Sequence, residues 1–198
     1  MKKILCALLA LLLLIGCTFT FASCNTPNDQ KPNDTQQGEN EDDKKQEEGE
    51  DQKDIVIPED YVVYDDGKIS FAYPKNWTKQ NGSVVILTGT NGNNITVVYE
   101  PKTNMYDDLT IESFNSMFKP AYESMGLTVS NVKIQKTKTN GLNIVQISHN
   151  TKNATATMKQ TQYVTTLGDR TYTITVTEVA SDAKLVSTVL ETLKAVEK

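Results

Sequence analysis

The chain has 198 residues and a net charge of −5, from 25 acidic and 20 basic side chains. The excess of acid lies in one segment, because residues 25–54 carry 11 acidic residues and 4 lysines, whereas residues 55–198 carry 14 of each sign. Arg170 is the single arginine. A nucleic-acid partner needs a basic surface that replaces the counterions of the phosphates. The neutral domain offers no such surface, so we expect no nucleic-acid partner.

The first residues have the layout of a secretory signal. Lys2 and Lys3 precede an apolar run from Ile4 to Ile15, as in the basic and apolar regions of a signal peptide. This run is shorter than the roughly 20 residues that a membrane-spanning helix needs. Extending it to Phe21 leaves an uncleaved anchor open as an alternative. We predict a signal peptide over residues 1–23.

All three cysteines, Cys6, Cys17 and Cys24, lie in the first 24 residues. The later residues can therefore form neither a disulfide nor a thiolate metal site. Two segments resemble the processing site of bacterial lipoproteins, in which an apolar residue stands two places before a small residue that directly precedes cysteine: Leu14-Ile15-Gly16-Cys17 and Phe21-Ala22-Ser23-Cys24. We favour Cys24, because apolar residues stop there, and keep Cys17 as the alternative.

The lipoprotein resemblance implies that a diacylglyceryl group is attached to the cysteine through a thioether, followed by cleavage before it. Two or more acyl chains give stable attachment, since each buried methylene adds about 0.8 kcal/mol. The mature protein would then stay on the extracytoplasmic face of the bacterial plasma membrane. A cleaved signal without a lipid is a further alternative.

Residues 24–54 are predicted to form a disordered acidic tether. Between Asn25 and Asp54 there is no aliphatic, aromatic, methionine or cysteine side chain. Ordering such a segment would cost about 1–2 kcal/mol per residue with no apolar surface to bury in return. We expect a solvated spacer between the membrane and a folded domain.

Residues 55–198 have the size of one domain. Turn dipeptides that tolerate positive φ punctuate this part of the chain: Asp66-Gly67, Asn91-Gly92, Asn140-Gly141 and Gly168-Asp169. They separate runs rich in β-forming residues, at 61–64, 69–73, 83–88, 95–99, 127–137, 142–148, 154–167 and 171–178. The pattern predicts an antiparallel meander.

Two stretches have helical rather than strand periodicity. In the C-terminal one the apolar residues fill one arc of a helix: Leu185, Val186, Val189, Leu190, Leu193 and Val196. The mid-chain one has a similar arc: Ile111, Phe114, Met117, Phe118, Ala121, Tyr122 and Met125. Pro120 interrupts the second stripe without changing its phase, so we expect a kink there. With the strands, these helices predict an α+β fold in which both helices pack on the sheet.

The segment Phe71-Ala72-Tyr73-Pro74-Lys75-Asn76-Trp77 resembles the Phe-x-Tyr-Pro-x-x-Trp opening of the PsbP-like superfamily, which contains the photosystem extrinsic subunit and bacterial lipoproteins. The likeness extends over residues 61–198, including the two later hairpins and the terminal helix. It implies a central antiparallel sheet between helices, in proteins that bind or assemble rather than catalyse. Phe71, Tyr73, Pro74 and Trp77 are expected to have a packing role.

Few residues indicate chemistry. His149 is the single histidine, and we expect it to be a surface residue just past a strand. With one histidine and no thiol, residues 55–198 offer no histidine or cysteine metal cluster. The glycine-rich run from Gly89 to Asn94 joins two strands and is expected to be a hairpin loop rather than a phosphate site. The threonines at 171, 173, 175 and 177, extended by Thr161 and Thr165, are expected on a solvated strand face.

We therefore expect a binding or accessory module, with no enzymatic activity, cofactor or metal. The first hypothesis is docking to another cell-surface protein or complex, through a patch that includes one or more of Tyr61, Tyr64, Tyr99 and Tyr106. The alternative is a carrier of a lipid or other apolar molecule. Its pocket would lie between sheet and helix, lined by Phe114, Phe118, Tyr122 and Met125.

Overall fold

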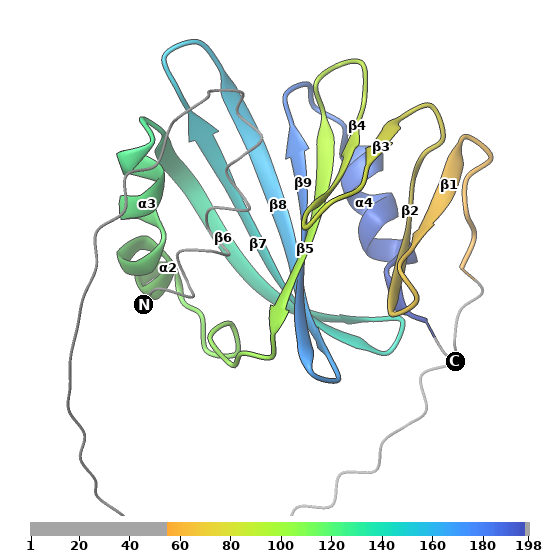
Figure 1. The fold of residues 1–198 in the computed structure, drawn as a ribbon. Coiled ribbons are helices and arrows are strands. Elements are labelled where there is room, and N and C mark those ends of the chain that lie inside the picture. Colours follow the sequence, from red (N-terminus) through yellow and green to blue (C-terminus); the bar gives the residue numbers. More distant parts are fainter. Residues whose placement is uncertain (1–54, 197–198) are drawn as a thin grey trace, which may run out of the picture.

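The computed structural model describes residues 55–196. In this range the chain forms ten strands and three helices (Figure 1). The strands are β1 (Tyr61–Asp65), β2 (Ile69–Pro74), β3 (Thr78–Gln80), β4 (Val85–Thr88), β5 (Asn94–Pro101), β6 (Thr128–Thr139), β7 (Leu142–Lys152), β8 (Thr157–Leu167), β9 (Arg170–Glu178) and β10 (Lys194–Ala195). The helices are α2 (Ile111–Met117), α3 (Lys119–Ser124) and α4 (Ala183–Thr192). The predicted α+β class is confirmed.

The larger sheet has seven strands in the order β3-β4-β5-β9-β8-β7-β6, and all its pairs are antiparallel. Strands β6 to β9 form the predicted meander. The turn between β6 and β7 has φ of 47° at Asn140 and 77° at Gly141, as a tight hairpin requires. The meander is closed by a long-range pair, because β9 lies against β5.

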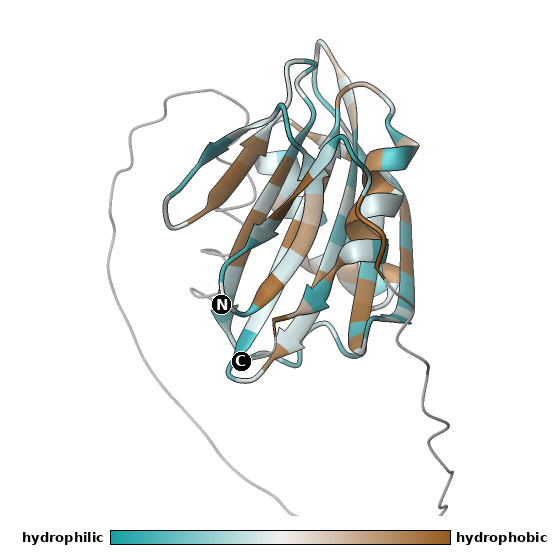
Figure 2. Ribbon diagram, turned by 90° about the vertical axis from the view of Figure 1, so that its right-hand side faces the viewer, coloured by the Kyte–Doolittle hydropathy of each residue, from teal (hydrophilic) through white to brown (hydrophobic). Residues whose placement is uncertain are grey.

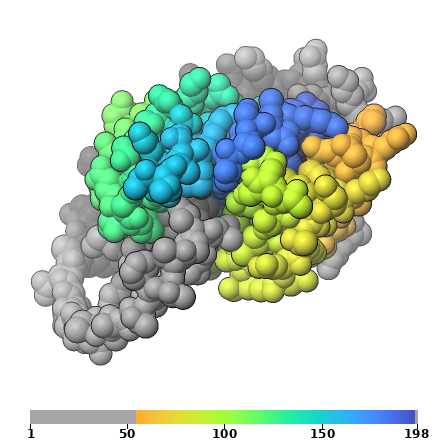
Figure 3. Space-filling view, turned by 90° about the horizontal axis from the view of Figure 1, so that it is seen from above, coloured from red at the N-terminus to blue at the C-terminus, as the bar shows by residue number. Residues whose placement is uncertain are grey.

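The smaller sheet has the order β1-β2-β10. The β1–β2 hairpin lies at one end of the molecule, beside α4 and β9, and β6 and β7 lie towards the opposite end (Figure 3). The backbone N–H of Ala72 in β2 donates to the Thr192 hydroxyl of α4 over 2.8 Å, inside the core. This bond fixes the helix against the smaller sheet.

Two apolar cores cover the two faces of the larger sheet. Hydrophobic and hydrophilic residues alternate along the strands (Figure 2). Because successive side chains of a strand point to opposite faces of the sheet, each strand contributes residues to both faces. The first core joins one face to the smaller sheet and α4, and includes Phe71, Leu87, Ile174 and Leu185. The second joins the other face to α2, α3 and the loop before them, and includes Phe114, Tyr122 and Ile147.

The mid-chain helical run differs from the expected single kinked helix. It consists of two short helices that meet at Phe118, which is both the C-cap of α2 and the N-cap of α3. Pro120 lies in the first turn of α3, where a missing backbone N–H leaves no hydrogen bond unmade. Because that position suits proline, the chain starts a new helix rather than bending one. Thr110 caps α2 through a reciprocal pair of bonds with Ser113.

Candidate functional site

The aromatic motif that resembles the PsbP-like opening lies at the border between the two sheets. Phe71 is fully buried and stacks on Tyr64, with ring centroids 5.0 Å apart. Pro74 is the last residue of β2, and Tyr73 beside it is half-buried. Trp77 follows in the loop and packs against the first core. Phe71, Tyr73 and Trp77 therefore contribute to the first core, and Pro74 ends β2.

Trp77 also explains why residue 89 is a glycine. A Cβ atom on Gly89 would lie 2.6 Å from Trp77 Nε1 and 2.7 Å from Cε2. Real contacts of this kind are never so close, so only glycine fits beneath the indole ring. Asn93, four residues later, is fully buried. Its Oδ1 accepts from the backbone N–H of Val179 and of Ala180, which fixes the β4–β5 loop to the end of β9.

Three of the four tyrosines expected in a surface patch are core residues instead. Tyr61, Tyr64 and Tyr106 are 8%, 3% and 9% exposed. The fourth, Tyr99, is 54% exposed, with the Arg170 guanidinium 4.2 Å from its ring centroid. The hairpin that carries Tyr61 and Tyr64 packs onto α4 and the larger sheet, so these rings lie between layers. Of these four tyrosines, Tyr99 alone remains exposed, so it is the one that a docking patch could include.

The expected threonine surface is also wrong. Thr171, Thr173, Thr175 and Thr177 are all less than 9% exposed. Thr161 lies directly opposite Val176, and directly paired residues of antiparallel strands share a face. Thr161 and Thr165 therefore point to the α4 side, away from the other four threonines. The side chains of β9 alternate between apolar and polar as predicted, but its polar face is buried rather than exposed to solvent.

His149 is buried and not a surface residue. It lies within β7, 1% exposed, with its ring 5.4 Å from those of Phe114 and Tyr122. Burial lowers the pKa of His149 to about 4, partly opposed by a hydrogen bond with Gln160. The imidazole is therefore neutral and enclosed, and it has no access to a substrate.

The aromatic residues proposed to line a carrier pocket belong to the second core. Phe114, Phe118 and Tyr122 are 2%, 6% and 1% exposed, and the two phenylalanine rings lie 5.2 Å apart. Met125, the fourth residue, is 42% exposed beyond the end of α3. The structure thus brings three of the four together as packing residues.

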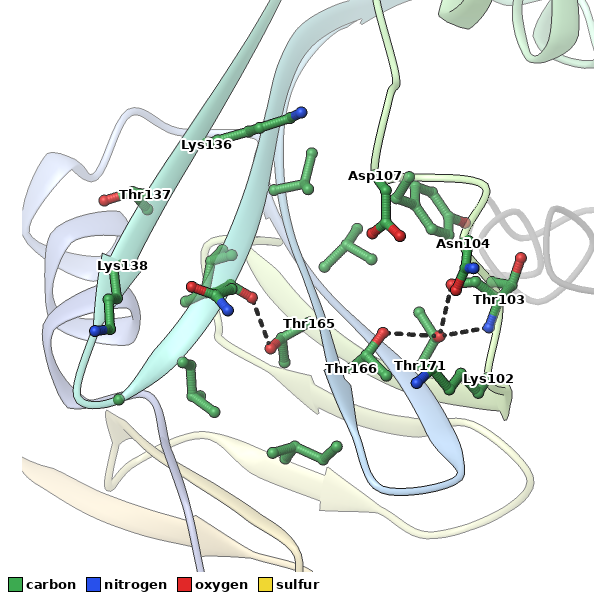
Figure 4. A pocket seen from close by; sticks show the side chains of 18 residues that line it. Lys102, Thr103, Asn104, Asp107, Lys136, Thr137, Lys138, Thr165, Thr166 and Thr171 are labelled. Atoms are coloured by element: carbon green, nitrogen blue, oxygen red, sulfur yellow. Dashed lines mark hydrogen bonds between the residues drawn. The ribbon is translucent and has the colours of Figure 1, made fainter. Parts of the chain in front are cut away.

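A cavity of about 700 Å³ lies elsewhere, between strands β6 to β9 and the loop that follows β5 (Figure 4). Its apolar wall is formed by Ile144, Val145 and Val164, and its polar lining includes Lys102, Asp107, Lys136 and several threonines. No sequence signal marked this cavity, because its walls come from five separate segments. It is the first of two candidate sites.

The second candidate site is the free side of β1. This strand pairs with β2 on one side and ends the smaller sheet on the other. Val62 and Val63 are 38% and 48% exposed, although they point to opposite faces of the strand. Val56 and Ile57, just before the strand, are 82% and 40% exposed. Apolar side chains thus gather along an open strand edge, which the sequence predicted as a strand but not as an edge.

Between residues 55 and 196 no group of three or more His, Cys, Asp or Glu side chains is placed to hold a metal ion. No helix in that part of the chain is long and apolar enough to cross a membrane. Cys17 and Cys24, the candidate lipid attachment sites, lie outside the described residues.

The sequence matches no protein-family profile and no curated protein. Its fold does match solved structures. A crystal structure from Bacteroides thetaiotaomicron VPI-5482 aligns with a TM-score of 0.44 at 13% identity, over 66% of this chain and 46% of that one, so this chain spans about half its length. The solution structure of cyanobacterial PsbP (CyanoP) from Synechocystis sp. PCC 6803 aligns with a TM-score of 0.52 at 14% identity, over 71% of this chain and 95% of that one. The chain has a PsbP-like fold.

Proposed function

We propose that the protein is a lipid-anchored, extracytoplasmic docking module that binds an extended segment of another cell-surface protein along the free edge of β1. The anchor is Cys24, with Cys17 as the alternative, and the acidic residues that follow separate the domain from the bilayer. The observation that carries the proposal is the open, apolar edge of β1. Strand addition at such an edge is a recurring mode of peptide recognition.

The hydrogen bonds of the β1–β2 hairpin show which backbone groups face outward. Asp66 N donates to Ile69 O over 3.3 Å, and Lys75 N donates to Asp60 O over 3.0 Å. In an antiparallel pair, hydrogen-bonded and non-hydrogen-bonded residue pairs alternate. Val63 lies three residues from each of these two hydrogen-bonded pairs, so its own pair in the hairpin is a non-hydrogen-bonded one.

The partner of Val63 in the register is Ala72. The Ala72 N–H donates to Thr192 on α4, away from β1, as the alternation requires. By the same alternation the N–H and C=O of Val63 point to the open side of β1. An added strand would therefore find one donor and one acceptor at the centre of this edge, flanked by exposed valines.

The other sheet edges carry features that hinder strand addition. β6 has three exposed lysines and a register shift between Ser130 and Lys133. β3 has three residues, including Lys79, and β10 has two. Short strands, lysines and bulges are the usual protection of edges. Within β1, by contrast, the sequence Tyr-Val-Val-Tyr-Asp contains neither lysine nor proline.

A non-catalytic role is supported by the placement of the reactive groups. His149, the only histidine, is 1% exposed behind aromatic rings. A general base must reach the proton that it removes, and this imidazole does not reach the surface.

The proposal is tested by purifying the tagged full-length chain from detergent-solubilised membranes of its own host. Val63→Lys places a charge on the open edge, and Val179→Lys is the matched control, because both valines are 48% exposed. We expect one protein to co-purify with the wild type and the control and to be lost from Val63→Lys. An identical set of co-purifying proteins in all three samples would contradict the proposal, provided that circular dichroism shows equal folding.

A further inference from the structure

The cavity in Figure 4 lies where two strands of the larger sheet separate. The β7–β8 register begins at the pair Val145–Val164 and continues away from the cavity. Beyond that pair, residues 142–144 at the start of β7 stay paired with β6, and residues 165–167 at the end of β8 stay paired with β9. The Thr165 hydroxyl donates to the Asn143 carbonyl over 2.9 Å and bridges the divergent ends. The separation of β7 and β8 is thus bounded by their ladder, which ends at Val145–Val164, and bridged by the bond from Thr165 to Asn143.

The loop after β5 forms the opposite wall and is fixed to the start of β9. Lys102 N donates to Asp169 O over 2.8 Å, and Thr103 N donates to the Thr171 hydroxyl over 3.0 Å. The Thr166 and Thr171 hydroxyls lie 3.2 Å apart, which extends the network to β8 (Figure 4). These bonds hold the wall in place without a ligand, so the cavity is pre-formed.

The lining combines an apolar floor with cationic side chains. Val145 and Val164 belong to the apolar part of the lining, and its charged part comprises three lysines, Lys102, Lys136 and Lys138, and one acid, Asp107. The salt bridges of the described residues include neither Lys102 nor Lys136. In Figure 4 the Lys136 side chain reaches from β6 towards the side of the cavity that carries Asp107. The two ammonium groups are thus available to an anionic ligand.

The volume is that of a ligand site rather than a packing defect. Protein interiors leave few voids larger than a water molecule, whereas sites for small molecules measure about 300–1,000 Å³. The cavity holds about 700 Å³. Such sites are mostly apolar, with a few polar groups that fix the orientation of the ligand.

We propose that this cavity binds a small amphipathic organic anion, with its apolar body on Val145 and Val164 and its anionic group towards Lys136. The site is distinct from the β1 edge, so its failure would leave the docking function standing. Its ligand class also differs from that of the neutral apolar carrier, since the lysines in the lining outnumber the acids, which favours a carboxylate or a similar anion.

The probe is 2-naphthoate, with 2-naphthamide as a neutral molecule of nearly the same shape. Both are titrated by calorimetry into the full-length chain in a non-ionic detergent, after subtraction of titrations into empty micelles. We expect one-to-one binding of the naphthoate and at least ten-fold weaker binding of the amide. Raising the salt concentration should weaken only the naphthoate, because screening acts on the charge.

Lys136→Gln removes one cation, and Lys133→Gln is the matched control on the same strand. Lys136 pairs with Val145 and Lys133 with Ser148, so the two lysines point to opposite faces of the sheet. We expect Lys136→Gln to weaken naphthoate binding at least five-fold and to leave the amide unchanged, while Lys133→Gln changes neither. Equal affinity for acid and amide, equal losses in both variants, or no binding at millimolar concentration would overturn the proposal.

Discussion

The Nε2 atom of His149 lies 3.0 Å from the Oε1 atom of Gln160, across the β7–β8 pair. The Gln160 amide nitrogen donates in turn to Thr177 on β9 over 3.3 Å. Since this leaves the amide oxygen facing the ring, the imidazole carries its proton on Nε2 and donates it. The Nδ1 atom is buried and has no hydrogen-bond partner among the described residues. The structure therefore requires a neutral His149.

This neutral histidine makes stability depend on pH. Burial lowers the pKa of His149 to about 4 from the ordinary 6.5, so between these values the unfolded chain binds a proton that the folded chain does not. The free energy of unfolding should therefore fall as the pH drops from 6.5 to 4. The decrease due to His149 should total about 3 kcal/mol at most, and below pH 4 this histidine should contribute no further change. Urea unfolding at several pH values measures it. The variant His149→Gln should show a smaller fall, and an unchanged fall would contradict the assignment.

Gly89 should not tolerate a side chain. Gly89→Ala places a methyl group 2.6 Å from Trp77 Nε1, so the indole ring must move out of the first core. Overpacking of this kind costs about 1–3 kcal/mol. Gly82→Ala is the control, because its nearest neighbour would lie at an ordinary 3.5 Å. Trp77 is the only tryptophan, so its fluorescence reports both unfolding midpoints directly. Equal unfolding midpoints for Gly89→Ala and Gly82→Ala would contradict the close contact between Gly89 and the Trp77 ring.

Asn93 should contribute strongly to stability through its side-chain amide. In Asn93→Ala the backbone N–H groups of Val179 and Ala180 lose their acceptor, and the Ala180 carbonyl loses its donor. These bonds are partly buried, so each should cost about 0.5–1.5 kcal/mol to lose. We expect a loss of several kcal/mol, against little change in Asn91→Ala, whose side chain is exposed and makes a single local bond. Similar losses in both variants would contradict the structural role of Asn93.

The anchor is tested through its cysteines. Cys24→Ala should abolish incorporation of a labelled fatty acid and, because attachment precedes cleavage, leave the chain at the mass of the full precursor, whereas Cys17→Ala should leave labelling and cleavage intact. The reverse result would identify Cys17 as the attachment site. A wild-type chain that carries no label and has the mass of the full precursor would instead show an uncleaved anchor.

Local patterns predicted most strands, both helical regions and the fold class, because periodicity and turn residues act within a few positions. What covers each face was not predictable in the same way. Thr171 and Thr175 alternate with apolar residues in β9 as expected of a strand with one solvated face, yet both are buried, because α2, α3 and the loop before them cover this face of the sheet. That cover comes from residues distant in the chain, which no local signal marks.

The candidate sites were missed for the same reason. Tyr61 and Tyr64 were expected on the surface and the two valines between them were not singled out, but the structure buries the tyrosines and exposes the valines. Which side chains of a hairpin face a core depends on where the hairpin docks. The cavity likewise arises from the separation of β7 and β8, a property of the assembled sheet.

The central claim, docking along the free edge of β1, is tested most directly by photo-crosslinking in intact host cells. A photoreactive amino acid replaces Val63 in one full-length variant and the equally exposed Val179 in another. We predict one discrete crosslinked product from position 63, containing an extended segment of a cell-surface protein, and none from position 179. Crosslinking at position 179 but not at 63, or no product from position 63 in a correctly localised chain, would contradict the claim.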